Sequence, residues 1–160
     1  MRTLTIESNG RIERTAVYIN GEQVSGIHEF FVGIDEEGMF TAIVTYPDKQ
    51  GNLLTKQIFS DDISQLPRRD PAYTDEDASN LQTLTIESDG TLDNTSVFIN
   101  DEFAEGIVSL TIHLRIESQP TTRSLFSSLF QKKSNISDTI FMNEIVFRNS
   151  DGSESTETLF

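Results

Sequence analysis

The chain has 160 residues, of which 26 are Asp or Glu and 12 are Lys or Arg, so its formal net charge is −14. It has no cysteine, which excludes a disulfide framework, a thiolate metal site and a cysteine nucleophile. The negative charge argues against binding to nucleic acid, because contacts with a phosphate backbone need clustered Lys and Arg. No apolar run approaches the roughly 20 residues of a membrane span, and the first residues lack the apolar stretch of a secretory signal. We therefore expect an acidic protein that is intracellular or bound to a particle.

An internal repeat organises the chain. The segment Thr3–Gly10 recurs almost unchanged as Thr83–Gly90, and more than half of the positions from Thr3 to Ile27 are identical at this spacing. The C-terminal parts of the two copies align at a larger spacing, which pairs Val44, Tyr46, Gly51, Thr55 and Phe59 with Ile145, Phe147, Gly152, Thr156 and Phe160. The change of spacing places an insertion in the second copy, at about residues 119–138.

Each copy consists of short segments that are typical of β-strands. The first copy has the predicted strands Thr3–Glu7, Thr15–Asn20, a strand around Phe30, Phe40–Tyr46 and Asn52–Phe59. The pair Asn20-Gly21 is a strong signal for a two-residue hairpin turn. The second copy repeats the first two strands and continues with Ile107–Glu117, Thr139–Arg148 and Ser153–Phe160.

The segment Ile107–Glu117 has the clearest period of two, which assigns its residues to two faces. Val108, Leu110, Ile112, Leu114 and Ile116 fall on one face, and the same phase in the first copy places His28, Phe30, Val32 and Ile34 inside. Phe31 falls on the opposite face, and we take it as a candidate partner-binding residue. Across both copies the predicted core comprises Val17, Ile19, Phe30, Val32, Val44 and Phe59, and Val97, Ile99, Leu110, Ile112, Ile145 and Phe160.

These segments predict an all-β protein that is a tandem duplication of a roughly five-stranded antiparallel module, either a small barrel or a sandwich. Residues 1–60 form the first module and residues 83–160 form the second. Residues 61–82 form an acidic, Pro-containing linker, in which we expect one helical turn near residues 61–66. A module of some 60 residues buries little surface by itself, so we expect the copies to pack on each other or on another molecule.

Neither histidine has the surroundings that catalysis would need. His28 and His113 align with Val108 and Gly33, so neither recurs in the other copy, and no nucleophile elbow accompanies them. The loops 89–94 and 149–152 are rich in oxygen ligands, but neither matches a calcium-binding EF-hand loop, and Asx-Gly pairs form turns without any metal. We therefore expect no enzyme activity, no metal and no cofactor.

The insertion in the second copy carries the strongest candidate for partner binding. Its apolar residues lie at helical i, i+4 spacing, which predicts a short helix with one apolar face. The candidate contact residues are Arg123, Leu125, Phe126, Leu129, Phe130, Lys132 and Lys133. Two interpretations stay open at this point: the segment covers the end of its own module, or it docks on a neighbouring subunit.

The segment Val17–Ile27, with its repeat Val97–Ile107, resembles a hairpin pattern of small uncharacterised β-rich proteins of tailed bacteriophages. The resemblance implies a virion-associated structural protein, such as a capsid decoration, neck or tail component. Its partners would be other virion proteins or further copies of itself, and its location the virion, or the host cytoplasm before assembly. The alternatives are a soluble acidic inhibitor or anti-defence protein that mimics nucleic acid, and a β barrel that binds a small ligand.

Overall fold

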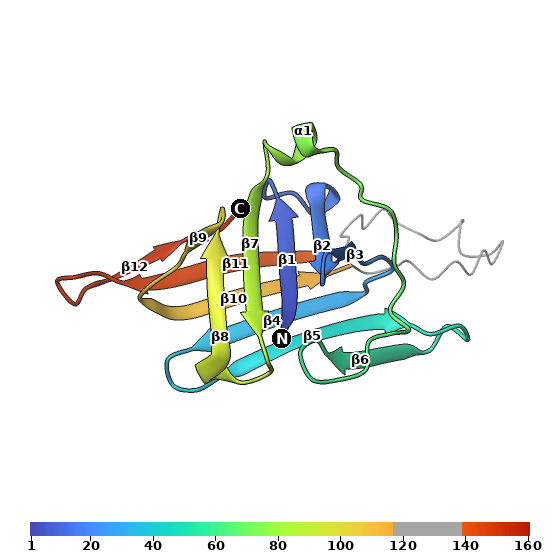
Figure 1. The fold of residues 1–160 in the computed structure, drawn as a ribbon, viewed down its shortest axis with the longest axis horizontal. Coiled ribbons are helices and arrows are strands. Elements are labelled where there is room, and N and C mark those ends of the chain that lie inside the picture. Colours follow the sequence, from blue (N-terminus) through green and yellow to red (C-terminus); the bar gives the residue numbers. More distant parts are fainter. Residues whose placement is uncertain (117–138) are drawn as a thin grey trace, which may run out of the picture.

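The computed structural model describes residues 1–116 and 139–160, and these residues form two six-stranded antiparallel sheets (Figure 1). The strands of one sheet run across those of the other, and their inner faces share one hydrophobic core. The predicted all-β class and the two similar modules are confirmed. The sheets stay open, so the sandwich is the correct alternative and the closed barrel is not.

The first sheet, here the β1/β7 sheet, has the order β3-β2-β1-β7-β8-β9. Its strands are β3 (Glu22–Gln23), β2 (Thr15–Ile19), β1 (Arg2–Ser8), β7 (Gln82–Ser88), β8 (Thr95–Ile99) and β9 (Glu102–Phe103). Short 3-10 turns, Ile12–Arg14 and Leu92–Asn94, precede β2 and β8. The short strands β3 and β9 raise the number of strands per copy from the predicted five to six.

The second sheet, here the β4/β10 sheet, has the order β12-β11-β10-β4-β5-β6. Its strands are β12 (Glu154–Glu157), β11 (Ile140–Arg148), β10 (Ile107–Arg115), β4 (Glu29–Asp35), β5 (Phe40–Pro47) and β6 (Leu53–Gln57). Both sheets therefore contain three strands from each copy of the repeat.

Each sheet is joined at its centre by residues that are equivalent in the repeat. In the first sheet Thr5 of β1 lies opposite Thr85 of β7, and their hydroxyl oxygens are 3.2 Å apart. In the second sheet Val32 of β4 lies opposite Ile112 of β10. A pseudo-twofold axis therefore passes through both pairs. The copies are interleaved in the way that two subunits of a symmetric dimer share an isologous interface.

The local structure of the two copies is the same at both β-hairpin turns. Asn20 and Asn100 have φ angles of 52° and 51°, in the left-handed region that a type I′ hairpin turn requires. The side-chain oxygen of each asparagine accepts a hydrogen bond of 3.0 Å from the backbone N–H of Thr3 or Thr83. Asp101 stands where the first copy has Gly21 and adopts a φ of 66°, which asparagine, aspartate and glycine tolerate best.

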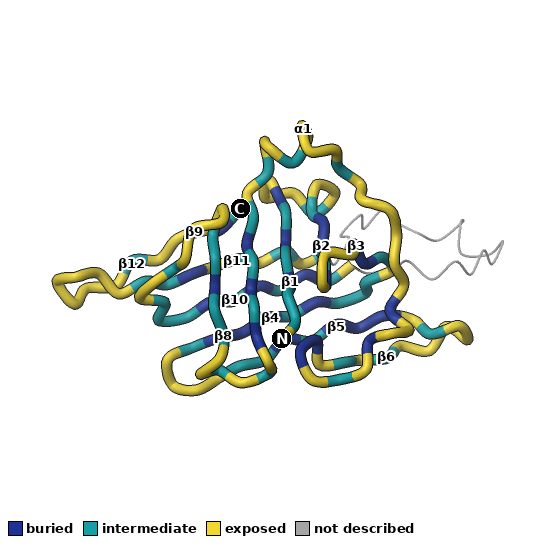
Figure 2. The backbone as a smooth tube through the Cα atoms, in the orientation of Figure 1, coloured by how far each residue is buried: buried dark blue, intermediate teal, exposed yellow. Residues whose placement is uncertain are grey.

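The core lies between the sheets, where buried and less buried positions alternate along the strands (Figure 2). Of the predicted core residues, Ile99 and Phe160 are half-buried, and the structure buries Val17, Ile19, Phe30, Val32, Val44, Phe59, Val97, Leu110, Ile112 and Ile145. The aromatic pairs Phe40–Phe59 and Phe141–Phe160 occupy equivalent places, with ring centroids 5.6 and 6.3 Å apart.

The alternation fails at both ends of β10. A bulge between Ile107 and Ser109 shifts the register and leaves Val108 half-buried. Ile116 follows the last residue of the strand and is exposed, and His28 precedes β4 and is half-buried. The predicted inward orientation is therefore wrong for Ile116 and only partly met by Val108 and His28.

Residues 61–82 are more closely tied to the sandwich than a linker would be, because Ile63 and Leu66 are buried in the core. The predicted helical turn at residues 61–66 is wrong, since the structure has only turns there. The short helix of this segment is α1 (Asp75–Ala78). Thr74 and Asp77 form a capping box that satisfies the first backbone N–H groups of α1, and this explains its position.

Candidate interaction site

The sequence-predicted contact residues fall into two groups. Phe31 lies in β4 and is half-buried. The other candidates lie outside the described residues, so their role stays a prediction: Arg123, Leu125, Phe126, Leu129, Phe130, Lys132 and Lys133.

Phe31 belongs to a row of side chains on the outer face of the β4/β10 sheet. Its neighbours across the strands are Ile43 of β5 on one side and His113 of β10 on the other, and His113 in turn faces Met142 of β11. The rings of Phe31 and His113 meet edge to face with their centroids 5.8 Å apart. Met142 is 46% exposed, which is high for an apolar side chain in the middle of a sheet row.

Gly33 explains how this row extends along the sheet. A Cβ atom at Gly33 would lie 2.9 Å from Cε1 of Phe31 and 3.0 Å from Cε of Met39. The missing side chain thus allows Phe31 and Met39 to lie over the backbone of β4, where Met39 remains 41% exposed. We call the apolar strip the set Phe31, Met39, Ile43, Ile140 and Met142.

One polar pair lies within the apolar strip, since His113 stands between Phe31 and Met142. Nε2 of His113 lies 2.7 Å from Oε1 of Glu29, and both side chains are about a quarter to a third exposed. The hydrogen bond holds the imidazole in place beside Phe31. A partner that covered the strip would therefore meet the apolar side chains of phenylalanine, methionine and isoleucine together with the hydrogen-bonded His113, a composition common in protein interfaces.

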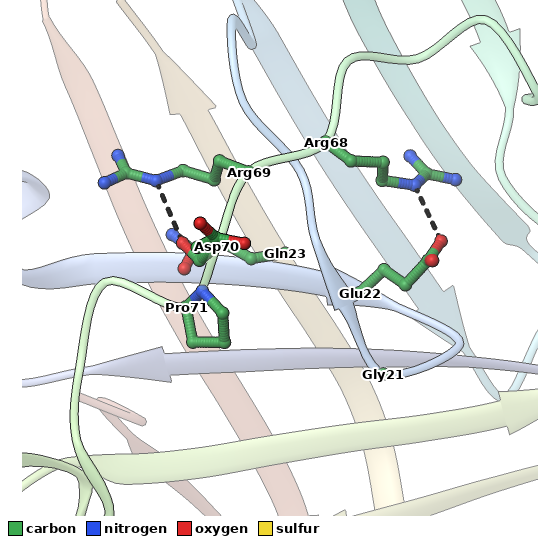
Figure 3. Close-up of a pocket in the computed structure, with 7 residues that line it drawn as sticks. All are labelled: Gly21, Glu22, Gln23, Arg68, Arg69, Asp70 and Pro71. Carbon is green, nitrogen blue, oxygen red and sulfur yellow. Dashed lines mark hydrogen bonds and ion pairs between the residues drawn. The ribbon is translucent and has the colours of Figure 1, made fainter.

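A second surface is formed where the segment after Leu66 crosses the edge strand β3 (Figure 3). Arg68 lies opposite Val24 in an antiparallel bridge. Nε of Arg68 is 3.2 Å from Oε2 of Glu22, toward which it points in Figure 3. A surface hollow of about 520 Å³ lies beside this contact and is lined by Gly21, Glu22, Gln23, Arg68, Arg69, Asp70 and Pro71.

The pairing of this segment with β3 was not predicted from the sequence, in which residues 61–82 were interpreted as an acidic, Pro-containing linker. A signal was present, because Pro67 and Pro71 flank Arg68-Arg69 and proline favours extended backbone before it. An extended segment with free backbone groups can pair with a sheet edge.

Tyr18 and Asp89 are among the groups whose pKa values are shifted. Burial raises the pKa of Tyr18 to about 12, and a hydrogen bond with Glu7 adds to the shift. Hydrogen bonds from Thr91 and Asn94 hold the pKa of Asp89 below its usual range. The carboxylate of Asp89 thus accepts hydrogen bonds from residues of the same turn.

Among residues 1–116 and 139–160, no group of three or more His, Asp or Glu side chains is placed to share a metal ion. In the same part of the chain, no helix has the length and apolar character to cross a membrane. Comparison with protein-family models, curated proteins and solved structures found no match to this chain.

Proposed function

We propose that the chain is a non-enzymatic structural protein of a phage particle, acting as a capsid decoration, neck or tail component through protein–protein contacts. The observation that carries the proposal is the apolar strip on the outer face of the β4/β10 sheet, together with the resemblance of the repeated hairpin to phage proteins. The protein would reside in the virion, or in the host cytoplasm before assembly.

The strip supports a role in binding proteins because exposed apolar side chains share the outer face of one sheet there, on both sides of β10. Single exposed apolar residues are ordinary, but contiguous ones mark interaction surfaces. Met39, Ile140 and Met142 are each about 40% exposed or more. Met39 lies with the half-buried Phe31 over Gly33, and Met142 lies on the other side of His113 from Phe31. Methionine suits such a surface because its flexible side chain adapts to the shape of a partner.

The mixed charge pattern of the outer faces favours this function over nucleic-acid mimicry. Arg148 binds Glu36 through two hydrogen bonds of 2.7 Å and lies 3.3 Å from Glu154, so a basic side chain stands between two carboxylates there. A mimic of a phosphate backbone would need uninterrupted carboxylates. The alternative of a ligand-binding barrel requires a closed barrel, which the open sheets do not form.

Sedimentation of particles from infected cells tests the proposal. The wild-type chain should sediment with the particles, and Phe31→Ser should reduce its occupancy while the purified variant remains folded. Leu53→Ser is the matched control, because Leu53 is 54% exposed on the edge strand β6, away from the strip. Recovery of the wild-type chain in the soluble fraction alone would contradict the proposal. Salt-sensitive capture of a DNA-binding protein, unaffected by Phe31→Ser, would favour the inhibitor instead.

A further inference from the structure

The two ends of the β1/β7 sheet are equivalent in the repeat but are covered differently. The sheet ends in β3 on one side and in β9 on the other. The segment that follows Leu66 covers β3, whereas no described residue pairs with the outer edge of β9. Within residues 1–116 and 139–160, the same edge thus occurs once with a bound segment, at β3, and once without one, at β9. We call these the occupied and the open edge.

The occupied edge shows how an extended chain binds there. The backbone N–H of Arg69 donates to the carbonyl of Gln23 over 3.0 Å, and the N–H of Ser25 donates to the carbonyl of Pro67 over 2.9 Å. The side-chain oxygen of Gln23 accepts a further hydrogen bond of 2.6 Å from the N–H of Ala72. As a result Gln23 is only 5% exposed, although it lies on a strand of two residues.

The open edge has the same backbone arrangement. The N–H of Ala104 donates to the carbonyl of Val97 over 2.8 Å, as that of Val24 donates to Val17 over 2.9 Å. Because hydrogen-bonding groups alternate along an antiparallel pair, the backbone groups of the adjacent Phe103 point away from β8. Phe103 occupies the place of Gln23 and is 58% exposed.

An apolar hollow lies next to the open edge and offers a place for a side chain of a ligand. It measures about 250 Å³ and is lined mainly by Ile34, Leu92, Val97, Phe103, Ala104 and Ile107. The equivalent hollow of the first copy measures about 310 Å³, and there Arg69 of the bound segment forms part of the wall. The ring of Phe103 also packs edge to face on Phe98, with centroids 5.7 Å apart.

The charge of the open edge indicates the chemistry of its ligand. Asp101 and Glu105 stand where the first copy has Gly21 and Ser25, so the open edge carries two additional carboxylates. Glu102 corresponds to Glu22, the residue that pairs with Arg68 at the occupied edge. Within the described residues, no ion pair involves Glu102. A ligand with basic side chains would supply the missing charge.

We propose that β9 binds an extended, basic peptide segment of another protein, which adds an antiparallel strand to the β1/β7 sheet. Such strand addition obtains affinity from backbone hydrogen bonds and specificity from side-chain pockets. A second copy of this chain fits less well, because pairing β9 with another β9 would bring Asp101, Glu102 and Glu105 against the same three residues. This proposal concerns the chemistry of the partner and does not depend on the assignment to a phage particle.

The test uses the intact chain and a fluorescent synthetic peptide with the sequence of residues 64–73, which contains the segment bound at the occupied edge. Fluorescence anisotropy should show saturable binding that weakens as salt is added, since the contacts include ion pairs. A peptide that is N-methylated at the position of Arg69 lacks the N–H that pairs with the strand, and it should bind about tenfold more weakly or worse.

Variants of the chain locate the binding site. Phe103→Ala and Glu102→Lys should each weaken binding about tenfold, the effect of losing a central contact. Leu53→Ala and Glu76→Lys are the controls, because both residues are exposed at other places. Circular dichroism should show that all four variants remain folded.

Three results would overturn the proposal. The first is the absence of binding at peptide concentrations of about 1 mM, the weakest affinity that would still be measurable. The second is equal binding of the N-methylated peptide or of the Phe103→Ala variant. The third is a dimer in analytical ultracentrifugation that Phe103→Lys dissociates and the peptide does not, which would assign β9 to a second copy of the chain.

Discussion

Leu110→Ala tests whether the interleaved copies unfold as one unit. Leu110 lies in β10 of the second copy and is fully buried, at 0% exposure. Removing such a side chain costs about 2–5 kcal/mol, from lost transfer free energy and the cavity left behind. The chain has three tyrosines, Tyr18, Tyr46 and Tyr73, and no tryptophan, so its near-ultraviolet fluorescence reports on residues of the first copy and the segment after it.

Urea unfolding followed by tyrosine fluorescence should therefore show the full loss of stability, although the substitution is in the other copy. Far-ultraviolet circular dichroism should give the same midpoint, because both sheets contain strands of both copies. Leu53→Ala is the control, and at an exposed site the change should stay within about 0.5 kcal/mol. The reasoning would be refuted if the fluorescence transition stayed in place while the circular dichroism signal split into two transitions.

Two further substitutions, Tyr18→Phe and Gly33→Ala, test the surroundings of single side chains. The pKa of Tyr18 is raised from the ordinary 10.0 to about 12 in the folded chain. The unfolded chain therefore loses this proton at a lower pH than the folded chain does. The contribution of the protonated Tyr18 to the free energy of unfolding is complete below pH 10 and is lost as the pH rises through about 12. Tyr18→Phe should remove that part of the decline, which urea midpoints at several alkaline pH values would measure. Gly33→Ala should displace the flexible ends of Phe31 and Met39 rather than the backbone. It should therefore leave the melting temperature nearly unchanged while shifting the NMR resonances of the His113 ring, which contacts Phe31.

The repeat and the alternation of apolar residues predict much of this fold. The duplicated turns at Asn20 and Asn100 form equivalent hairpins, and most residues of the inward phase, including Phe30 and Leu110, are buried. Alternation reports which face of a strand is buried, because successive side chains point to opposite faces. It gave the phase of β10 correctly in the middle of the strand, but not at its ends, beside the bulge at Val108 and at the exposed Ile116.

The pattern does not specify which strands are neighbours. Thr5 and Thr85 have the same surrounding sequence, so separate modules and shared sheets would give the same pattern of apolar residues. The candidate surfaces could not be predicted from the sequence for a similar reason. Gln23 is buried because a distant segment pairs beside it, whereas no segment among the described residues pairs beside Phe103, which is exposed. That difference depends on tertiary pairing and not on the residues of either strand.

A pair of engineered cysteines tests the shared sheets most directly. Thr5 and Thr85 lie opposite each other with their hydroxyls 3.2 Å apart, and the chain has no other cysteine to interfere. A disulfide needs Cβ atoms about 3.5–4.5 Å apart, and directly opposed residues of an antiparallel pair approach this separation. Thr83 lies opposite Glu7, so the combination Thr5→Cys with Thr83→Cys is out of register and serves as the control.

The measurement is the intact mass and the gel mobility of the oxidised protein without reducing agent. The interleaved fold predicts that Thr5→Cys with Thr85→Cys forms an intramolecular disulfide in the monomer, and that the control pair stays reduced under the same conditions. Free thiols in both variants, or disulfides that only link separate chains, would contradict the pairing of β1 with β7.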